Sequence, residues 1–251
     1  MANEAKQWWE SAARDFQEMA QLPIDILYGP HVNEAKLQLI GSVAGKCVLE
    51  IGCGGAQCGI AFAKLGAIVS GVDIASAQIE YAKELCQKNG VTISLYERDM
   101  TDLEPIASES QDLVFSSWAF PYVDDLHSCF KEVHRVLKTD GLFVWSVWHP
   151  IFAIIDGPSL LPTRSYLDTG KVVSGLEVSD EPGFAFAENY RTVSDYFNTL
   201  LEAGFTVDRI VEPDIRPVDA DDPQNHLWNY TPRMYELFPA TLVFKSRKIQ
   251  R

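Results

Sequence analysis

The sequence predicts an α/β fold in which a mostly parallel sheet is joined by crossover helices. Between residues 46 and 148, short runs rich in β-branched residues alternate with amphipathic helical patterns, which is the order that parallel sheets require. The apolar run 48–51 leads directly into the glycine-rich turn 52–55, and a helical pattern follows at once. A strand, a glycine turn and a helix in this order form the nucleotide-binding end of an open α/β sheet.

The glycine turn is the most informative local feature. Gly52, Gly54 and Gly55 carry no Cβ, so they can adopt positive φ and let a ligand approach the main chain. The helix predicted at 57–65 would begin at that ligand, and Gly66 suits its C-terminal cap.

Two further helices are predicted from apolar spacing and from the glycines that follow them. The helix predicted at 76–89 has apolar residues at helical spacing and stops at Gly90. The helix predicted at 124–138 buries four apolar side chains, has two aspartates in its first turn and ends before Gly141. Between the helices, strands are predicted at 67–73, 92–96, 112–117 and 142–148.

Composition limits the classes of function. The chain has 251 residues, 47% of them hydrophobic, and a formal net charge of -14. So acidic a chain without a Lys/Arg-rich run is a poor partner for nucleic acid. No apolar stretch approaches membrane-spanning length, and the start lacks the apolar core of a signal peptide, so we expect a soluble cytoplasmic enzyme. Five cysteines in no metal-binding spacing argue against disulfides and against a bound metal.

The nucleotide class follows from two positions. A dinucleotide fingerprint starting at Gly52 would need glycine where the chain has Gln57. The segment 48–56, with Asp73 at the end of the next strand, resembles motif I of the class I S-adenosylmethionine-dependent methyltransferases, in particular the small-molecule, methyltransferase type 11-like members. That family usually has glycine where this chain has Ala56. The resemblance implies a Rossmann-like open seven-stranded sheet with helices on both faces, S-adenosylmethionine as cofactor and S-adenosylhomocysteine as product.

The resemblance also implies a cofactor site. Asp73 would accept hydrogen bonds from both ribose hydroxyls; the alternative is an N-cap for the helix that starts near Ser76. Asp99 and Met100 resemble the pair that contacts the adenine, although a lone acid at a strand end can also be a solvated turn residue. The full set of expected cofactor-binding residues is Tyr28, Glu50, Gly52, Cys53, Gly54, Gln57, Asp73, Ile74, Gln78, Asp99, Met100, Ser116 and Ser117.

The resemblance continues to about residue 248. Residues 190–205 and the strand 206–211 resemble the late helix and sixth strand of small-molecule members, and 238–248 resembles their terminal strand, which inserts antiparallel between the fifth and sixth. We expect one methyltransferase domain with four parts: an N-terminal helical cap (1–40), a cofactor-binding core (41–150), a substrate lid insertion (151–189) and a C-terminal part that completes the sheet (190–251). The apolar stripe of Trp8 in the cap could equally pack on the helices of the sheet.

Two residues are candidates for catalysis. Methyl transfer is an in-line displacement that depends mainly on positioning, but some acceptors must also lose a proton. His149 is the first candidate for a base, since the strand end directs it to the crevice; it could instead only hold the turn before Pro150. Tyr122 could hydrogen-bond the acceptor or contact the sulfonium through its ring face. His31 has no such placement.

The predicted function is methyl transfer to a small molecule. The segment 119–122 lacks the polar residue and second proline of nucleic-acid amino-methyltransferases, and the aromatic residues of the lid indicate an apolar or aromatic acceptor. An NAD(P)-dependent oxidoreductase would need a hydride-site pair such as Tyr/Lys, which we do not find. A cofactor-binding protein without transferase activity is the remaining alternative, and only activity separates it from an enzyme.

Overall fold

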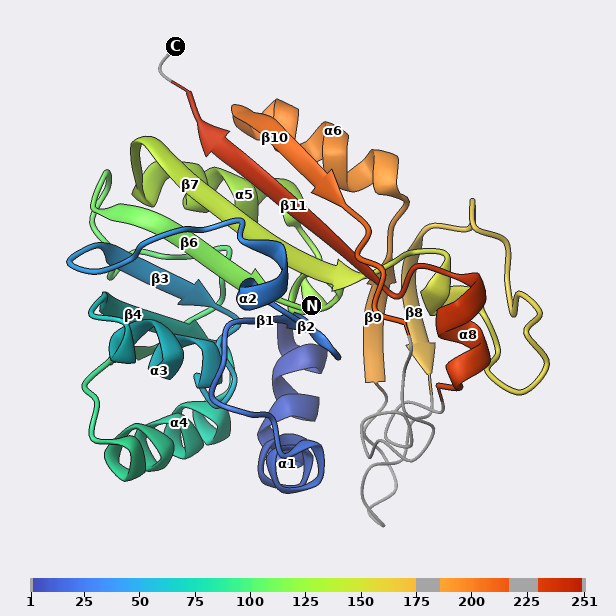
Figure 1. Cartoon of the computed structure of the whole chain (residues 1–251), viewed down its shortest axis with the longest axis horizontal. Coiled ribbons are helices and arrows are strands. Elements are labelled where there is room, and N and C mark those ends of the chain that lie inside the picture. Colours follow the sequence, from blue (N-terminus) through green and yellow to red (C-terminus); the bar gives the residue numbers. More distant parts are fainter. Residues whose placement is uncertain (1, 175–185, 217–229, 250–251) are drawn as a thin grey trace.

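A computed structural model describes residues 2–174, 186–216 and 230–249. Its central sheet has seven strands in the order β10-β11-β7-β6-β3-β4-β5 (Figure 1). All are parallel except β11, which pairs antiparallel with both of its neighbours. The predicted Rossmann-like sheet, with an antiparallel terminal strand between the fifth and sixth, is therefore confirmed. In chain order the strands are β3 (Cys47–Ile51), β4 (Ile68–Asp73), β5 (Ser94–Glu97), β6 (Gln111–Ser117), β7 (Leu137–Trp148), β10 (Phe205–Val211) and β11 (Thr241–Lys248).

Helices cover both faces of the sheet. On one face lie α3 (Gln57–Lys64) and α4 (Ser76–Asn89), and on the other lie α5 (Leu126–Val136) and α6 (Val193–Ala203) (Figure 1). Each face buries its own apolar cluster, and on the α5/α6 face the rings of Trp145 and Phe244 stack at 4.4 Å. Removal of this apolar area from water is the main force that holds helices to sheet.

The largest differences from the predicted boundaries concern one helix and the strand that follows it. The helix expected at 124–138 is two residues shorter at each end, because Asp125 is its N-cap and accepts from the Ser128 amide. At the other end, the carbonyls of Arg135 and Val136 accept from the amides of residues 109 and 110. These hydrogen bonds end the helix at Val136, so β7 begins at Leu137 rather than at residue 142.

Two groups of elements lie outside the sheet. The N-terminal group is α1 (Ala2–Ala20), β1 (Leu27–Gly29), β2 (Val32–Asn33) and α2 (Glu34–Leu37). The second group is η2 (Phe152–Ile154), β8 (Gly170–Ser174) and β9 (Phe186–Tyr190), with α8 (Pro232–Leu237) beside them (Figure 1). The insertion expected to be a long loop thus contains a strand pair, β8 with β9; its residues 175–185 lie outside the described part. No helix in the described ranges is long and apolar enough to cross a membrane.

Candidate active site

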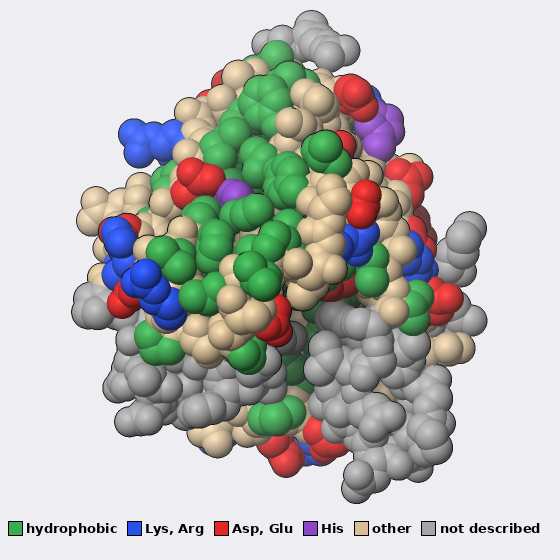
Figure 2. Space-filling view, turned by 90° about the vertical axis from the view of Figure 1, so that its right-hand side faces the viewer, with side chains coloured by type: hydrophobic (Ala, Val, Ile, Leu, Met, Phe, Trp, Pro, Cys, Tyr) green, Lys and Arg blue, Asp and Glu red, His purple; other side chains and the backbone are tan. Residues whose placement is uncertain are grey.

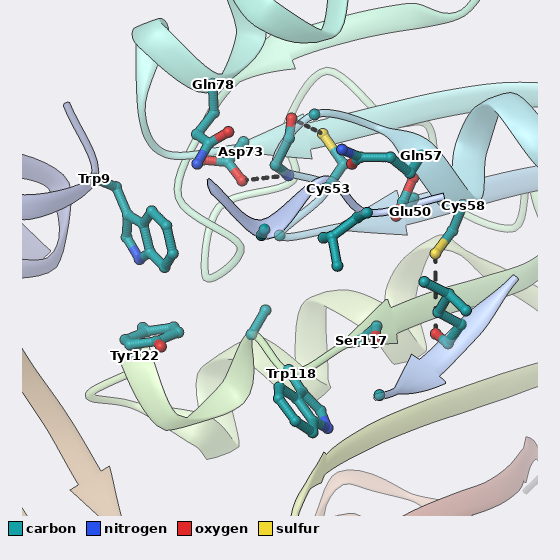
Figure 3. A pocket seen from close by; sticks show the side chains of 18 of the residues that line it. Trp9, Glu50, Cys53, Gln57, Cys58, Asp73, Gln78, Ser117, Trp118 and Tyr122 are labelled. Atoms are coloured by element: carbon teal, nitrogen blue, oxygen red, sulfur yellow. Dashed lines mark hydrogen bonds between the residues drawn. The ribbon is translucent and has the colours of Figure 1, made fainter. Parts of the chain in front are cut away.

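A cavity of about 770 Å³ lies where the strands β3, β4, β5 and β6 end. Figure 3 shows Asp73, Gln78 and Gln57 on one side of it and Tyr122 and Trp118 on the other. The carboxyl ends of parallel strands are where ligands of such sheets bind. Of the residues predicted from sequence, the cavity is lined by Glu50, Gly52, Cys53, Gly54, Gln57, Asp73, Ile74, Gln78, Asp99, Met100, Ser117 and Tyr122.

The glycine turn is shaped by the protein's own packing as well as by room for a ligand. Gly52 and Gly54 have φ of 62° and 51°. A Cβ at Gly52 would lie 2.3 Å from the Cβ of Ala119, so the segment after β6 requires glycine there. Ala56, at the N-cap of α3, also has left-handed backbone, with φ of 57°, a conformation that costs about 1–2 kcal/mol with a side chain.

Asp73 links the turn to the following segment. Its Oδ2 accepts from the amide of Gly54 at 2.8 Å and its Oδ1 accepts from the amide of Ala75 at 3.0 Å. Burial raises the pKa of Asp73 to about 6. The amide of Ile74 also hydrogen-bonds this carboxylate, which still has lone-pair capacity for a ligand hydroxyl. Asp73 is not the N-cap of α4, since that position is Ala75.

A second buried acid lines the wall below the turn. Glu50 at the end of β3 accepts from the amide of Gly59 at 2.7 Å. Burial raises its pKa to about 8, so the side chain is mostly protonated at neutral pH. These two acids therefore differ in charge at neutral pH, because Glu50 is mainly neutral and Asp73 is mainly ionised.

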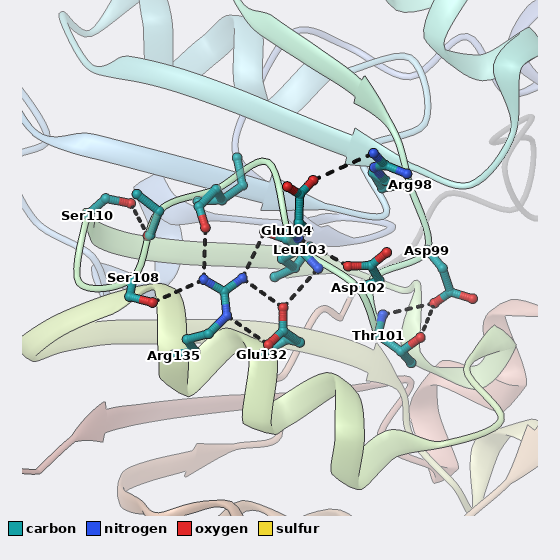
Figure 4. Close-up of polar contacts among 12 residues, drawn as sticks. Arg98, Asp99, Thr101, Asp102, Leu103, Glu104, Ser108, Ser110, Glu132 and Arg135 are labelled. Atoms are coloured by element: carbon teal, nitrogen blue, oxygen red, sulfur yellow. Dashed lines mark hydrogen bonds and ion pairs between the residues drawn. The ribbon is translucent and has the colours of Figure 1, made fainter.

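Asp99 and Met100 start the loop that follows β5. The amide and hydroxyl of Thr101 both donate to Oδ1 of Asp99 at 2.8 Å, which leaves Oδ2 with no such donor among the described residues. The rest of the loop is fixed by Arg135 of α5, which donates to the carbonyls of Leu103 and Ile106 at 2.8 and 2.9 Å (Figure 4). This hydrogen-bond network is the structural support of the loop.

The other end of the cavity is aromatic. Tyr122, in η1 (Phe120–Tyr122), has its ring edge-to-face with Trp9 at 5.5 Å and with Trp148 at 6.2 Å. Trp118 packs edge-to-face on Trp148 at 5.1 Å and has φ of 57°, which is rare for a bulky residue. Its indole lies against the main chain of Gly29, where a Cβ would be only 2.8 Å away. Stored strain of this kind is typical of functional sites.

Comparison with known proteins assigns this site to a family. Residues 49–145 match the model of a methyltransferase domain family. A crystal structure of an S-adenosylmethionine-dependent methyltransferase from Mesorhizobium loti is similar over 85% of this chain and 96% of that one, with a TM-score of 0.66 and 25% identity. Residues 49–145 thus belong to a methyltransferase domain family, and the chain as a whole has the fold of an S-adenosylmethionine-dependent methyltransferase. Its fold, cofactor and enzyme class are thereby those expected from the sequence.

Relatives of this methyltransferase differ in sequence identity and in the share of the chain that they match. A ubiquinone biosynthesis O-methyltransferase from Haemophilus ducreyi is 31% identical over 57% of this chain, which spans 59% of the relative's length. An uncharacterized protein from Haemophilus influenzae is 26% identical over 86% of each chain. The chain therefore spans less than two thirds of the first of these relatives but most of the second.

The residues of the cavity fit the methyl donor. The turn 52–55 presents main chain to the cavity, Asp73 can accept from a ribose, and Asp99 has a carboxylate oxygen that can accept from an adenine amine. All five cysteines are free. Within the described ranges, no group of three or more His, Cys, Asp or Glu residues could hold a metal.

Three predicted site residues do not line the cavity. Tyr28 is fully buried, packs on Phe115 and donates to Glu34 at 2.6 Å. Ser116 is also fully buried and donates to the carbonyl of Ile51. Both side chains are therefore held in the protein interior, away from the cavity lining.

His149 is the third. Its Nδ1 accepts from the amide of Ile151 at 3.1 Å, and its Nε2 lies 2.8 Å from Glu212. Because Nδ1 is the acceptor, Nε2 carries the proton and donates to Glu212. Burial lowers the pKa of His149. Both ring nitrogens are thus engaged away from the cavity, and the geometry supports the alternative in which His149 holds the turn.

Residues of α1 and of the turn after β1 also line the cavity, although none of them was among the predicted site residues. Trp9, Phe16 and Gln17 of α1 line the cavity, whereas Trp8 is buried beside Ala12. The signal was present, since Ala5, Trp9, Phe16 and Ala20 also recur at helical spacing. His31, for which no placement was found, also lines the cavity.

Proposed function

We propose that this methyltransferase transfers the methyl group to a small-molecule acceptor of apolar or aromatic character. The observation that carries the proposal is the continuity of one cavity from the glycine turn and Asp73 to the aromatic end around Tyr122 and Trp118. Aromatic rings favour flat apolar partners, through offset or edge-to-face contacts. The net charge of -14 disfavours a nucleic-acid acceptor, which needs several cationic contacts.

The chemistry divides between the two ends of the cavity. When bound, S-adenosylmethionine supplies an electrophilic methyl group on a sulfonium. We assign the turn 52–55 to its amino-acid end, Asp73 to the ribose, and Asp99 with Met100 to the adenine. Cys53, Gln57, Ile74, Gln78 and Ser117 would complete this part of the wall.

Tyr122 is the residue that we assign to the acceptor. Burial raises the pKa of its phenol well above the usual value, so the group stays protonated at neutral pH and can donate a hydrogen bond. This supports orientation of the acceptor by Tyr122 rather than removal of a proton. We do not propose His149 as a base, because both of its ring nitrogens are used elsewhere.

The regions outside the sheet fit the roles of cap and lid. Helix α1 supplies Trp9 and Phe16 to the cavity wall, and β9 contacts both α1 and η1. Figure 2 shows many hydrophobic side chains on the face where β8, β9 and α8 lie. Exposed apolar side chains include Val173 of β8 and Leu237 of α8, together with Leu161 and Leu167 in the segment before β8. Within the described ranges, no residue of 151–189 lines the cavity, so the proposed lid role of this insertion rests on the contacts of β9 with α1 and η1. The cavity residues of α1 support residues 1–40 as a cap.

An acceptor screen tests the proposed function. The relatives named for ubiquinone biosynthesis are O-methyltransferases, so alkylated phenols and catechols are the first acceptors to try. We expect S-adenosylhomocysteine and a methylated product, detected by mass spectrometry, with these compounds. Tyr122→Phe should raise KM for the acceptor and leave cofactor affinity unchanged. Transfer to an RNA or DNA oligonucleotide and to none of the small molecules would contradict the proposal.

A further inference from the structure

Three buried glutamines meet above the glycine turn. Gln17 of α1, Gln57 of α3 and Gln78 of α4 are 3%, 6% and 2% exposed. Gln57 donates to Oε1 of Gln17 at 2.6 Å, and Nε2 of Gln17 donates to Oε1 of Gln78 at 3.0 Å. Buried amides need such partners, because an unpaired one costs about 1–3 kcal/mol. The central residue of these hydrogen bonds is Gln17, which comes from the N-terminal helix α1.

The Gln17 amide lies directly against the turn. A Cβ at Gly54 would be 3.5 Å from its Nε2, and a Cβ at Gly55 would be 3.0 Å from its Oε1. The turn is also the part of the cavity assigned above to the amino-acid end of the cofactor. A ligand that follows this main chain therefore passes within reach of the Gln17 side chain.

The cavity offers few other donors for a carboxylate. Among the described residues that line it, Lys36 is the single Lys or Arg, and its Nζ donates to the carbonyl of His31 at 2.8 Å. Two acids, Glu50 and Asp73, lie in the same wall. A carboxylate bound here depends on main-chain N–H groups and on neutral amides, and Gln17 has a second N–H beyond the one given to Gln78.

Glu10 fixes the position of Gln17. Helix α4 begins after Ala75, which has no side chain that can cap it. Glu10 of α1 accepts instead from the amides of Ser76 and Ala77 at 2.9 and 3.0 Å, and from the Ser76 hydroxyl. Free N–H groups at a helix start need an acceptor, so this contact holds α1 against α4. Because Glu10 lies seven residues before Gln17 in the same helix, the contact also positions Gln17.

We propose that Gln17 is a binding residue for the carboxylate at the amino-acid end of S-adenosylmethionine and S-adenosylhomocysteine. The proposal rests on the cofactor site assigned above and adds to it a residue from the N-terminal helix. Glu10 is a positioning residue for this contact. The N-terminal helix then forms part of the cofactor site itself, in addition to covering the acceptor.

Calorimetry with two nucleosides tests the proposal. S-adenosylhomocysteine carries the amino-acid end, whereas 5′-methylthioadenosine has the same adenosine and sulfur without it. Gln17→Ala should weaken S-adenosylhomocysteine about 10- to 100-fold, the range for a hydrogen bond to a charged group, and leave methylthioadenosine unchanged. Gln17→Met, which keeps the side-chain volume, should give the same result without a packing defect.

Controls separate the possible failures. Glu18→Ala, on the exposed side of the same helix, should bind both nucleosides like the unmodified protein. Equal losses of both ligands in Gln17→Met would overturn the proposal, since Gln17 would then only hold the fold; unchanged binding of both would overturn it too. If the unmodified protein bound neither nucleoside, the cofactor site itself would be refuted.

Discussion

At the scale of single residues, Asp73 has the most consequential environment. It holds two main-chain amides of the cofactor wall while burial raises its pKa to about 6 from the 3.8 of an exposed aspartate. A raised pKa means that ionised Asp73 is disfavoured by the fold. Its contribution to stability is therefore full below pH 3.8 and is lost as the pH rises towards 6.

This environment predicts a pH dependence of cofactor binding. Ionised Asp73 is the better acceptor for ribose hydroxyls, so the affinity for S-adenosylhomocysteine should rise between pH 5 and pH 7 and then level. Asp73→Asn should flatten this profile and lower the affinity at pH 7.5 about 10- to 100-fold. Calorimetric titrations across the range measure both. The ribose assignment would be contradicted if the affinity of the unmodified protein for S-adenosylhomocysteine did not change with pH. It would also be contradicted if Asp73→Asn and the unmodified protein had equal affinities at pH 7.5.

Local sequence predicted some site residues and not others. Asp73 and Asp99 were predictable because each follows a strand, and strand ends converge in this fold. His149 also follows a strand, yet its partner Glu212 lies 63 positions away, and such a distant contact leaves no local pattern. Gln17 was missed for the same reason, since its partners belong to α3 and α4.

At the scale of elements, the loop 99–110 shows how α5 supports the cofactor site. Glu132 of α5 accepts from the amide of Leu103, and Arg135 of α5 donates to the carbonyl of Leu103. The hydrogen bond from Arg135 lowers the pKa of Glu132 below its ordinary value although burial opposes this, so the pair stays charged at neutral pH. The loop that carries Asp99 and Met100 therefore depends on a helix that does not itself line the cavity.

A variant of Arg135 tests this dependence. Arg135→Ala removes the donors to the carbonyls of Leu103 and Ile106, so we expect unfolding stability to fall by about 1–3 kcal/mol. Affinity for S-adenosylhomocysteine should fall several-fold because the adenine wall loosens. Arg98→Ala is the control, since its ion pair with Glu104 is exposed at 3.7 Å and such pairs contribute little. Equal effects of the two variants would refute this role of α5.

Most elements were predictable because their apolar period is strong. The α4 helix has the predicted bounds, and the strands of the core are found within a few residues. The strand pair β8–β9 was not predicted, since prolines and glycines interrupt the insertion and short strands carry little periodic signal. The boundary between α5 and β7 depends on contacts with residues 109 and 110, which periodicity does not contain.

At the scale of the whole molecule, distant segments meet around one cavity. Gly29 of β1, Trp118 after β6 and Thr241 of β11 converge so closely that a Cβ on Gly29 would lie within 2.9 Å of both side chains. The insertion of the antiparallel terminal strand between the fifth and sixth was predicted through the family resemblance and not from periodicity, because pairing between distant strands is not encoded locally. The aromatic end of the cavity exists only in the complete fold.

The central claim is that one cavity holds the cofactor at the glycine turn and the acceptor at the aromatic end. A crystal structure of the complex with S-adenosylhomocysteine tests it most directly. We predict the amino-acid end along residues 52–55 with its carboxylate at Gln17, the ribose on Asp73, and the sulfur facing open space beside Tyr122 and Trp118. Binding of the ligand anywhere else, or a sulfur enclosed by protein with no room for an acceptor, would contradict the account.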